Sequence, residues 1–269
     1  MKKYSLLKKE EVHKEFEEIT KATIPSTLIK FVSLDNRKRQ NEKKFLTLQN
    51  NQLWFSSISQ FNDPYECKSF FVEDQMLQRF GYDADTVQLY KRFIEELGDN
   101  AVIVSLSGNT INTLPMWAYY TGNYHGFCIE YEVISPDCIH PVYYTENRLD
   151  VAPVLAGFIN DLYDMLSENP YDIKALHSKA ALLLHQLNIK HCSWEHEQEY
   201  RVIAMVRKQG KGIRISAEEV GLKPRRIVAG INCKPEHLER LQEISDALSC
   251  GKVLQARTSK DKFTLFEEA

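Results

Sequence analysis

Several features are missing from this 269-residue sequence. No apolar run approaches the roughly 18 to 20 residues that a membrane-spanning helix needs, and the charged start at Lys2 and Lys3 is not followed by the apolar region of a signal peptide. We therefore expect a cytoplasmic protein with no membrane partner. The formal net charge is only −3, so the basic footprint of a dedicated nucleic-acid-binding protein is also missing.

Closely spaced metal ligands are missing as well. The sequence has no Cys-x-x-Cys pair and no histidines grouped at metal-ligand spacing. We expect no metal site and interpret the scattered cysteines as buried thiols. They are Cys67, Cys128, Cys138, Cys192, Cys233 and Cys250.

The composition is that of a globular protein, with 43% hydrophobic and 26% charged residues. No repeat or linker divides the chain, so we expect a single α+β domain over residues 1–269. Apolar periodicity and capping signals predict helices over Lys9–Thr20, Asp83–Leu97, Leu114–Tyr120, Asp150–Leu166, Asp172–Leu187 and Pro235–Leu248. Strands are predicted over Thr27–Val32, Leu53–Ser56, Ala101–Ser107, Phe127–Tyr131, Tyr200–Val206, Ile227–Ile231 and Val253–Ala256.

This order of elements predicts a mixed, largely antiparallel central sheet. The two helices at about residues 150–190 are expected to form a helical insertion in this sheet or a cap on it. The strongly polar stretch Ser33–Lys44 is expected to be an exposed loop.

The most unusual pattern is Glu197-Gln198-Glu199-Tyr200-Arg201, at the start of the strand predicted near Tyr200. Alternate residues of a strand share a face, so Glu197, Glu199 and Arg201 are expected to project together. Like charges at this spacing repel, and strands disfavour Glu. The pattern therefore indicates either a structural ion-pair network around Arg201 or a site that uses carboxylates.

The segment Phe61–Glu66 (Phe-Asn-Asp-Pro-Tyr-Glu) predicts a tight turn, because Asn62 and Asp63 can satisfy backbone groups ahead of a proline. A second interpretation brings Asp63 and Glu66 near Glu197 and Glu199. Such an acidic cluster could hold a divalent metal, and the protein would then be a metal-dependent nuclease or phosphodiesterase.

Aromatic residues surround the predicted loop between Gly122 and Gly126. Trp117, Tyr120 and His125 are suited to stacking against a planar ring, although aromatics at helical spacing are also typical of a core. The glycines permit close approach of a ligand to the backbone, so we include these three residues in a candidate binding site.

The motifs together resemble the bacterial family catalogued as domain of unknown function 2971. The resemblance covers about Thr27 to about Ile231, and it names a family without a settled activity. It rests on Leu53–Ser56, Phe61–Glu66, Ser105–Ser107, Met116–Tyr120, Gly126–Ile129, Tyr143-Tyr144, and Lys190 with Trp194–Arg201.

The chain also resembles the ADP-ribosyltransferase fold, whose members carry a basic residue on an early strand, a Ser-x-Ser strand end and a later Glu-x-Glu. Here Lys30, Ser105-x-Ser107 and Glu197-x-Glu199 occur in that order, with Lys in place of the usual Arg or His and a long separation between the first two elements.

That resemblance implies an NAD-consuming enzyme that cleaves the nicotinamide–ribose bond, with NAD as substrate and no permanently bound cofactor. It implies that Glu199 stabilises the charge that develops on the ribose, while Glu197 orients or deprotonates an acceptor, which would be a protein or a nucleic acid. Ser105 and Ser107 would brace the nicotinamide side or Glu199, and Lys30 would hold the pyrophosphate. A defence or toxin role suits such chemistry. The alternatives are the metal-dependent nuclease and a binding module without catalysis.

Overall fold

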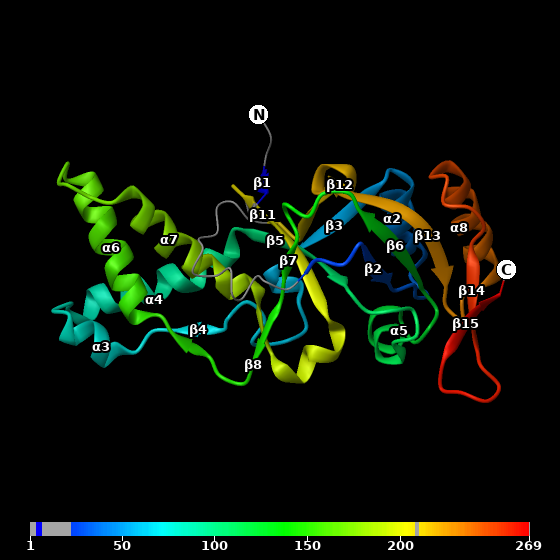
Figure 1. Cartoon of the computed structure of the whole chain (residues 1–269), viewed down its shortest axis with the longest axis horizontal. Coiled ribbons are helices and arrows are strands. Elements are labelled where there is room, and N and C mark those ends of the chain that lie inside the picture. Colours follow the sequence, from blue (N-terminus) through cyan, green and yellow to red (C-terminus); the bar gives the residue numbers. More distant parts are fainter. Residues whose placement is uncertain (1–3, 7–22, 208–209, 269) are drawn as a thin grey trace.

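The structure is a computed structural model that describes residues 4–6, 23–207 and 210–268. The molecule is elongated, with a group of helices at one end and a large sheet with its covering helices at the other (Figure 1). The helix predicted over Lys9–Thr20 lies outside the described residues.

The described elements agree with most of the predicted strands and helices, but β13 runs over Leu222–Ala229 where Ile227–Ile231 is predicted, and β12 (Gly212–Ser216) and β15 (Leu265–Glu268) are not predicted. The helices are α2 (Lys38–Gln49), α3 (Asp74–Arg79), α4 (Ala84–Asp99), α5 (Leu114–Tyr120), α6 (Ala152–Leu166), α7 (Ile173–Leu184) and α8 (Pro235–Ala247). The main strands are β1 (Tyr4–Leu6), β2 (Thr27–Val32), β3 (Gln52–Ser57), β5 (Ala101–Ser107), β6 (Phe127–Val133), β11 (Glu199–Val206), β12 (Gly212–Ser216), β13 (Leu222–Ala229), β14 (Leu254–Thr258) and β15 (Leu265–Glu268). Shorter strands are β4 (Phe70–Phe71), β7 (His140–Pro141), β8 (Tyr143–Thr145), β9 (Leu149–Asp150) and β10 (Ile189–His191).

The main sheet has the order β1-β11-β5-β2-β6-β13-β14-β15, with β3 pairing β5, β12 pairing β3 and β7 pairing β11. Its pairs are antiparallel except β13 with β14. The prediction of a mixed, largely antiparallel central sheet is therefore confirmed. This order places β2, β5 and β11 side by side at the centre of the sheet, although more than 160 residues separate β2 from β11 in the sequence.

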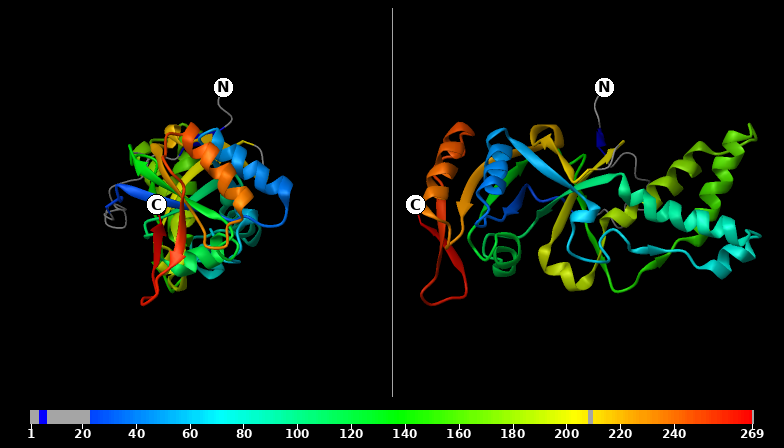
Figure 2. Two further views of the ribbon diagram at one scale, coloured as in Figure 1. Left: turned by 90° about the vertical axis from the view of Figure 1, so that its right-hand side faces the viewer. Right: turned by 180° about the vertical axis from the view of Figure 1, so that it is seen from behind.

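Helices cover both faces of the main sheet at the end of the molecule away from α6 and α7. Helices α2 and α8 pack against each other over one face, where the main hydrophobic core includes Phe45, Phe55, Phe127 and Leu241 (Figures 1 and 2). Helix α5 packs on β2 in a second cluster that contains Phe31 and Trp117. The centre of the sheet is thus rigidly supported, which suits a site that needs fixed side chains.

The helical end is built from two separated parts of the chain, and the helical pair predicted at about residues 150–190 is one of them. Helices α6 and α7 do form a hairpin there, but they share a core with α3 and α4 from residues 74–99. Val87, Tyr90 and Ile94 of α4 are buried at helical spacing and pack in the same cluster as Leu155 of α6. The apolar side of the amphipathic helix α4 has to be buried, and the hairpin of α6 and α7 covers it.

The prediction of an exposed loop over Ser33–Lys44 is wrong in its second half, because α2 begins at Lys38. Lys, Arg, Gln and Glu are good helix formers, so a polar stretch can open a helix whose apolar residues come later. Phe45 and Leu48 are those residues, and both are buried. Within the described ranges, no helix is long and apolar enough to cross a membrane.

Candidate active site

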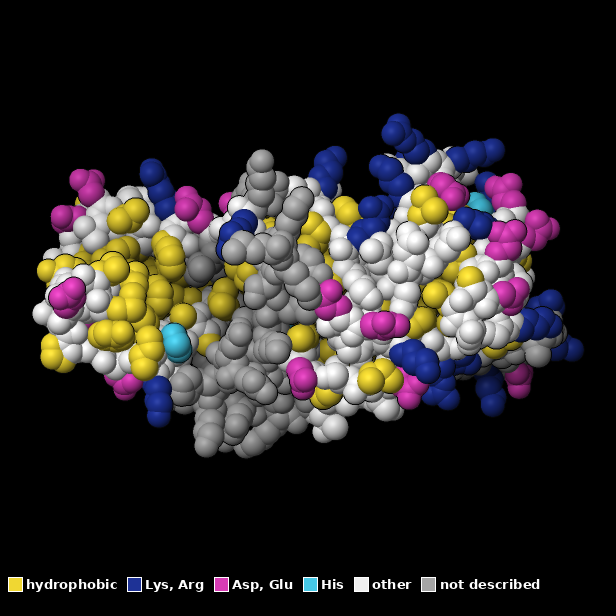
Figure 3. Space-filling view, turned by 90° about the horizontal axis from the view of Figure 1, so that it is seen from above, with side chains coloured by type: hydrophobic (Ala, Val, Ile, Leu, Met, Phe, Trp, Pro, Cys, Tyr) yellow, Lys and Arg dark blue, Asp and Glu magenta, His cyan; other side chains and the backbone are white. Residues whose placement is uncertain are grey.

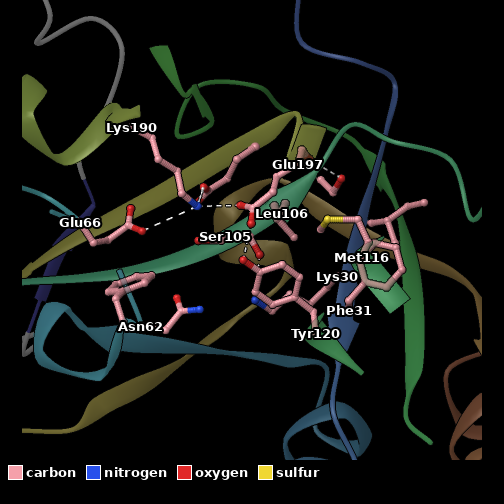
Figure 4. A pocket seen from close by; sticks show the side chains of 14 residues that line it. Lys30, Phe31, Asn62, Glu66, Ser105, Leu106, Met116, Tyr120, Lys190 and Glu197 are labelled. Atoms are coloured by element: carbon pink, nitrogen blue, oxygen red, sulfur yellow. Dashed lines mark hydrogen bonds and ion pairs between the residues drawn. The ribbon is translucent and has the colours of Figure 1, made fainter. Parts of the chain in front are cut away.

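A pocket of about 130 Å³ opens where the central strands meet the loop at residues 61–66, the helix α5 and the short strand β10 (Figure 4). Charged, polar and apolar side chains all line it. The lining residues are Ile29, Lys30, Phe31, Phe61, Asn62, Glu66, Ser105, Leu106, Ser107, Met116, Tyr120, Lys190, Glu197 and Glu199. Most of the residues selected from the sequence therefore converge on one pocket.

Arg201 is completely buried beside this pocket and holds two of its carboxylates. Its Nε donates to Glu199 Oε1 at 2.8 Å, and its Nη2 donates to Glu199 Oε2 at 3.2 Å and also to Glu66 Oε1. Its Nη1 donates to the carbonyl oxygen of Leu187 at 2.5 Å. The guanidinium thus ties β11 to the 61–66 loop and to the end of the helical hairpin.

Lys190 brings a second buried cation to the same carboxylates. Its Nζ lies 2.6 Å from Glu197 Oε2, 3.0 Å from Glu199 Oε2 and 3.7 Å from Glu66 Oε2 (Figure 4). Burial alone would lower the pKa of Lys190, but the three carboxylates overcome that effect and raise it. Its ammonium therefore stays charged and occupies the centre of the acidic cluster.

Glu199 is ionised at neutral pH in spite of its burial. Burial raises the pKa of its carboxyl, but the charges of Arg201 and Lys190 and hydrogen bonds from Arg201 and Ser105 lower the pKa to about 2. Its backbone amide donates to the hydroxyl of Tyr144 at 2.8 Å, which fixes the start of β11. A carboxylate held in this way is a fixed negative charge on the pocket wall.

Glu197 does not share the strand face of Glu199 and Arg201, which corrects the prediction. It ends a 3-10 turn (Cys192–Glu197), and Gln198 then adopts a left-handed conformation with φ 44° before β11 begins. Ser107 Oγ donates to the carbonyl oxygen of Glu197 at 2.7 Å and holds this turn against β5. The turn, and not the alternation of side chains along a strand, therefore places Glu197 next to Glu199 at Lys190.

Lys30 and Ser105 reach the pocket from β2 and β5, and Ser105 lies directly across from Arg201 on the neighbouring strand. Lys30 Nζ donates to the backbone carbonyl of Ser105 at 2.8 Å. Burial lowers the pKa of Lys30 to about 8, and the Glu199 carboxylate opposes part of that shift. With Lys30 protonated, three cations face three carboxylates in this region, and the site is electrically balanced.

Tyr120 and several apolar side chains form the remaining wall. The Tyr120 hydroxyl donates to Glu197 Oε1, and burial together with that carboxylate raises the pKa of Tyr120. Phe31, Phe61 and Met116 complete the lining. Aromatic and thioether groups of this kind suit contact with a flat ring.

Two predicted binding residues lie outside the pocket. Trp117 is fully buried in the cluster under α5, where its ring meets Phe31 edge-on and its Nε1 donates to the carbonyl oxygen of Ile111 at 2.7 Å. His125 is exposed, and its Nδ1 lies 2.8 Å from the carbonyl oxygen of Gly122. The core interpretation of these aromatics is correct for Trp117, and only Tyr120 of the three reaches the pocket.

Some residues of the Phe61–Glu66 segment form the predicted turn, and others join the cluster of acidic residues. Asp63 Oδ1 accepts from the amide of Tyr65 at 2.9 Å, so Asp63 shapes the turn and does not line the pocket. Asn62 and Glu66 do line it, and Glu66 joins the ion-pair network. Among the described residues, no group of three or more His, Cys, Asp and Glu side chains is arranged to hold a metal ion.

Lys190 is the central cation of the site, but it is not among the site residues predicted from the sequence, where it belongs only to a motif. Its signal was the isolated lysine in Leu187-Asn188-Ile189-Lys190, where a charged residue follows buried neighbours. A lysine buried on a short strand needs carboxylate partners, and the Glu197-x-Glu199 pattern begins seven residues later. Phe31, Phe61 and Met116 carried no signal that separates a pocket lining from a core.

Comparisons of the chain with protein-family models, with curated proteins and with solved structures find no significant match.

Proposed function

We propose that this protein is an NAD-consuming enzyme of the ADP-ribosyltransferase or NAD glycohydrolase type, and that the pocket between β2, β5 and β11 is its active site. The observation that carries the proposal is the meeting of Lys30, Ser105 and Glu199 at one pocket on three adjacent strands. These residues belong to the three patterns that resemble the ADP-ribosyltransferase fold. Chance matches in a sequence have no reason to converge in this way.

The chemistry follows from the fixed charge of Glu199. Breaking the bond between nicotinamide nitrogen and ribose carbon leaves the electron pair on nicotinamide and develops positive charge on the ribose ring. A carboxylate that is already ionised and held by Arg201 can stabilise that charge without reorganising. The oxygen of water or of an acceptor group then bonds to the ribose carbon and gives its proton to Glu197 or to solvent water.

The other pocket residues have supporting roles in this reaction. Glu197, with Tyr120 hydrogen-bonded to it, would orient the acceptor, and Ser105 would hold Glu199. Lys30 would attract the pyrophosphate as a point charge. The pocket is smaller than the roughly 300–1,000 Å³ typical of sites that enclose a drug-sized ligand, so it would take the nicotinamide ring and leave the adenosine half outside.

The buried ion pairs also support a competing role, in which the glutamates only fasten β11 to its neighbours. Glu199→Gln separates the two. We expect the wild-type protein to release nicotinamide from NAD, with a protein or nucleic-acid acceptor if water does not suffice. We expect the variant to remain folded and to lose roughly 10²–10³-fold in rate.

The matched control is Asp161→Asn, which removes another ion-paired carboxylate, bonded to Lys179 at 2.6 Å in the helical end. This variant should keep the wild-type rate. The proposal is wrong if the wild-type protein releases no nicotinamide, or if Glu199→Gln lowers only the melting temperature and leaves the rate unchanged.

A further inference from the structure

A second cavity, of about 610 Å³, adjoins the pocket at β2, β5 and β11. Ile29 of β2 lines both cavities, and Gly108 of the second directly follows Ser107 of the first. The second cavity lies within the range of roughly 300–1,000 Å³ that is typical of ligand sites, whereas the first has room only for a small ring. Together they can hold a ligand that is longer than either cavity.

More than half of the residues that line the second cavity are polar. They offer hydroxyl, amide, carboxylate and guanidinium groups, which suit a ligand that carries hydroxyl groups and charge. The position in the molecule agrees with this, because Figure 3 shows charged side chains of both signs over the sheet end, whereas hydrophobic side chains gather over the helical end. The polar residues of the lining are Thr27, Asn109, Thr110, Asn112, Glu130 and Arg226.

The register of the main sheet connects the second cavity to Glu199. Glu199 of β11 lies directly opposite Ser107 of β5, which in turn lies opposite Ile29 of β2. Ile29 lies opposite Glu130 of β6, and Glu130 lies opposite Arg226 of β13. Residues that lie directly opposite each other project from the same face of a sheet, so these five form one row across it. Strands are about 4.8 Å apart, so Glu130 lies three strands, or about 14 Å, from Glu199 along the row.

The loop that follows β5 forms a fixed wall of the second cavity. The backbone amide of Asn109 donates to Ser107 Oγ at 3.2 Å, and its Nδ2 donates to the carbonyl oxygen of His196 at 2.7 Å. Asn112 Oδ1 accepts from the backbone amide of Leu265 at 3.0 Å. The loop is therefore held to the 3-10 turn before β11 at one end and to β15 at the other, so the wall is in place before a ligand binds.

Glu130 is the one carboxylate among the residues that line the second cavity, and its side chain is only 14% exposed. Arg226 holds it through Nε and Nη2, each 2.8 Å from Glu130 Oε2. Both of these contacts use Oε2, so Oε1 can accept a hydrogen bond from a ligand. A carboxylate that accepts from the 2′-hydroxyl of the adenine ribose is a common way in which proteins bind NAD, and a 2′-phosphate in the same place would be repelled.

We propose that the second cavity binds the adenosine half of NAD, and that Glu130 accepts a hydrogen bond from the 2′-hydroxyl of the adenine ribose and so selects NAD over NADP. The inference rests on the proposed function, which supplies the identity of the ligand. With the nicotinamide ring beside Glu199, an extended dinucleotide passes its diphosphate over Ile29 and brings its second ribose to Glu130. The phosphate that distinguishes NADP would then meet the Glu130 charge at short range.

The test is calorimetric titration of the full chain with ADP-ribose and with 2′-phospho-ADP-ribose, which both lack nicotinamide and need no turnover. The wild type should bind ADP-ribose at least about 10-fold more tightly than the phosphorylated form. Glu130→Gln should raise the Kd for ADP-ribose roughly 10-fold, because a hydrogen bond to a neutral amide is weaker than one to a carboxylate, and it should remove most of the preference. The amide oxygen of Gln can still accept from Arg226, so the melting temperature should change little.

The matched control is Glu132→Gln, because Glu132 is an exposed carboxylate two residues further along β6, on the same face, and does not line the cavity. It should bind both compounds as the wild type does. The inference is overturned if the wild type binds no ADP-ribose, binds both compounds equally, or loses neither affinity nor preference in Glu130→Gln. Release of nicotinamide from NAD, measured separately, tests the proposed function: a protein that binds ADP-ribose through Glu130 without releasing nicotinamide would refute that function and keep this site.

Discussion

The buried guanidinium of Arg201 should dominate the stability of the centre of the sheet. Arg201→Met keeps most of the side-chain volume but removes five hydrogen bonds, which run to Glu199, to Glu66, to the carbonyl oxygen of Leu187 and to the sulfur of Cys67. Three buried carboxylates would then share Lys190 and the weakly held charge of Lys30. Removing one partner of a buried ion pair typically costs about 3–5 kcal/mol, so we expect a loss of that size in the free energy of unfolding.

Urea unfolding followed by circular dichroism measures this loss, and an unchanged dependence on urea concentration shows that the comparison is valid. Arg240→Met is the matched control, because Arg240 pairs with Glu243 at 2.7 Å at the surface, where the two side chains are 30% and 67% exposed. Exposed pairs contribute about 0–1 kcal/mol, so this variant should be nearly as stable as the wild type.

A double-mutant cycle tests the stated cause. Glu66→Gln removes one of the carboxylates that Arg201→Met leaves uncompensated, so the double variant should be more stable than the sum of the single effects by about 0.5–3 kcal/mol. A loss below about 1 kcal/mol for Arg201→Met, or strict additivity with Glu66→Gln, would refute the reasoning that charge balance governs this region.

Three further outcomes follow from the same site. The pKa of Glu199 is lowered from 4.5 to about 2, so the stability that its charge provides is present above pH 4.5 and is lost as the pH falls toward 2. The free energy of unfolding should therefore decline less steeply over this pH range in Glu199→Gln than in the wild type. The pKa of Lys30 is lowered from 10.5 to about 8, so its positive charge is lost as the pH rises through 8, and the KM of the wild type for NAD should rise with it. Lys30→Arg stays charged, so an equal rise of KM in that variant would contradict a role of the Lys30 charge in binding NAD. Tyr120→Phe removes a hydrogen bond to Glu197, whose carboxylate still pairs with Lys190. Urea unfolding should therefore show a loss of about 1 kcal/mol in the free energy of unfolding, and an unchanged value would mean that this hydrogen bond contributes nothing to stability.

The strands of the site could be predicted because local patterns determine them. The bounds expected for β2 and β5 agree with the structure residue for residue, since apolar and β-branched runs with polar ends specify a strand wherever it lies. The strand predicted over Tyr200–Val206 matches β11 except that β11 begins one residue earlier, at Glu199. The turn that carries Glu197 was not, because a left-handed Gln198 has no sequence signature comparable to that of glycine.

The remainder of the site depends on contacts between distant parts of the chain. Nothing near Lys190 shows that its ammonium meets Glu66, which lies more than 120 residues earlier. Trp117 illustrates the reverse case, since an aromatic on a short helix beside a glycine loop has the same local pattern whether it faces a ligand or the core. Only the packing of α5 on β2 decides between these positions.

A crystal structure of the Glu199→Gln variant with intact NAD would test the central claim most directly. The account predicts that the nicotinamide ring lies in the pocket near Phe61 and Tyr120, with a ribose hydroxyl within hydrogen-bond distance, about 2.6–3.2 Å, of the side chain at position 199. An empty pocket at saturating NAD, or NAD bound at another surface, would contradict it.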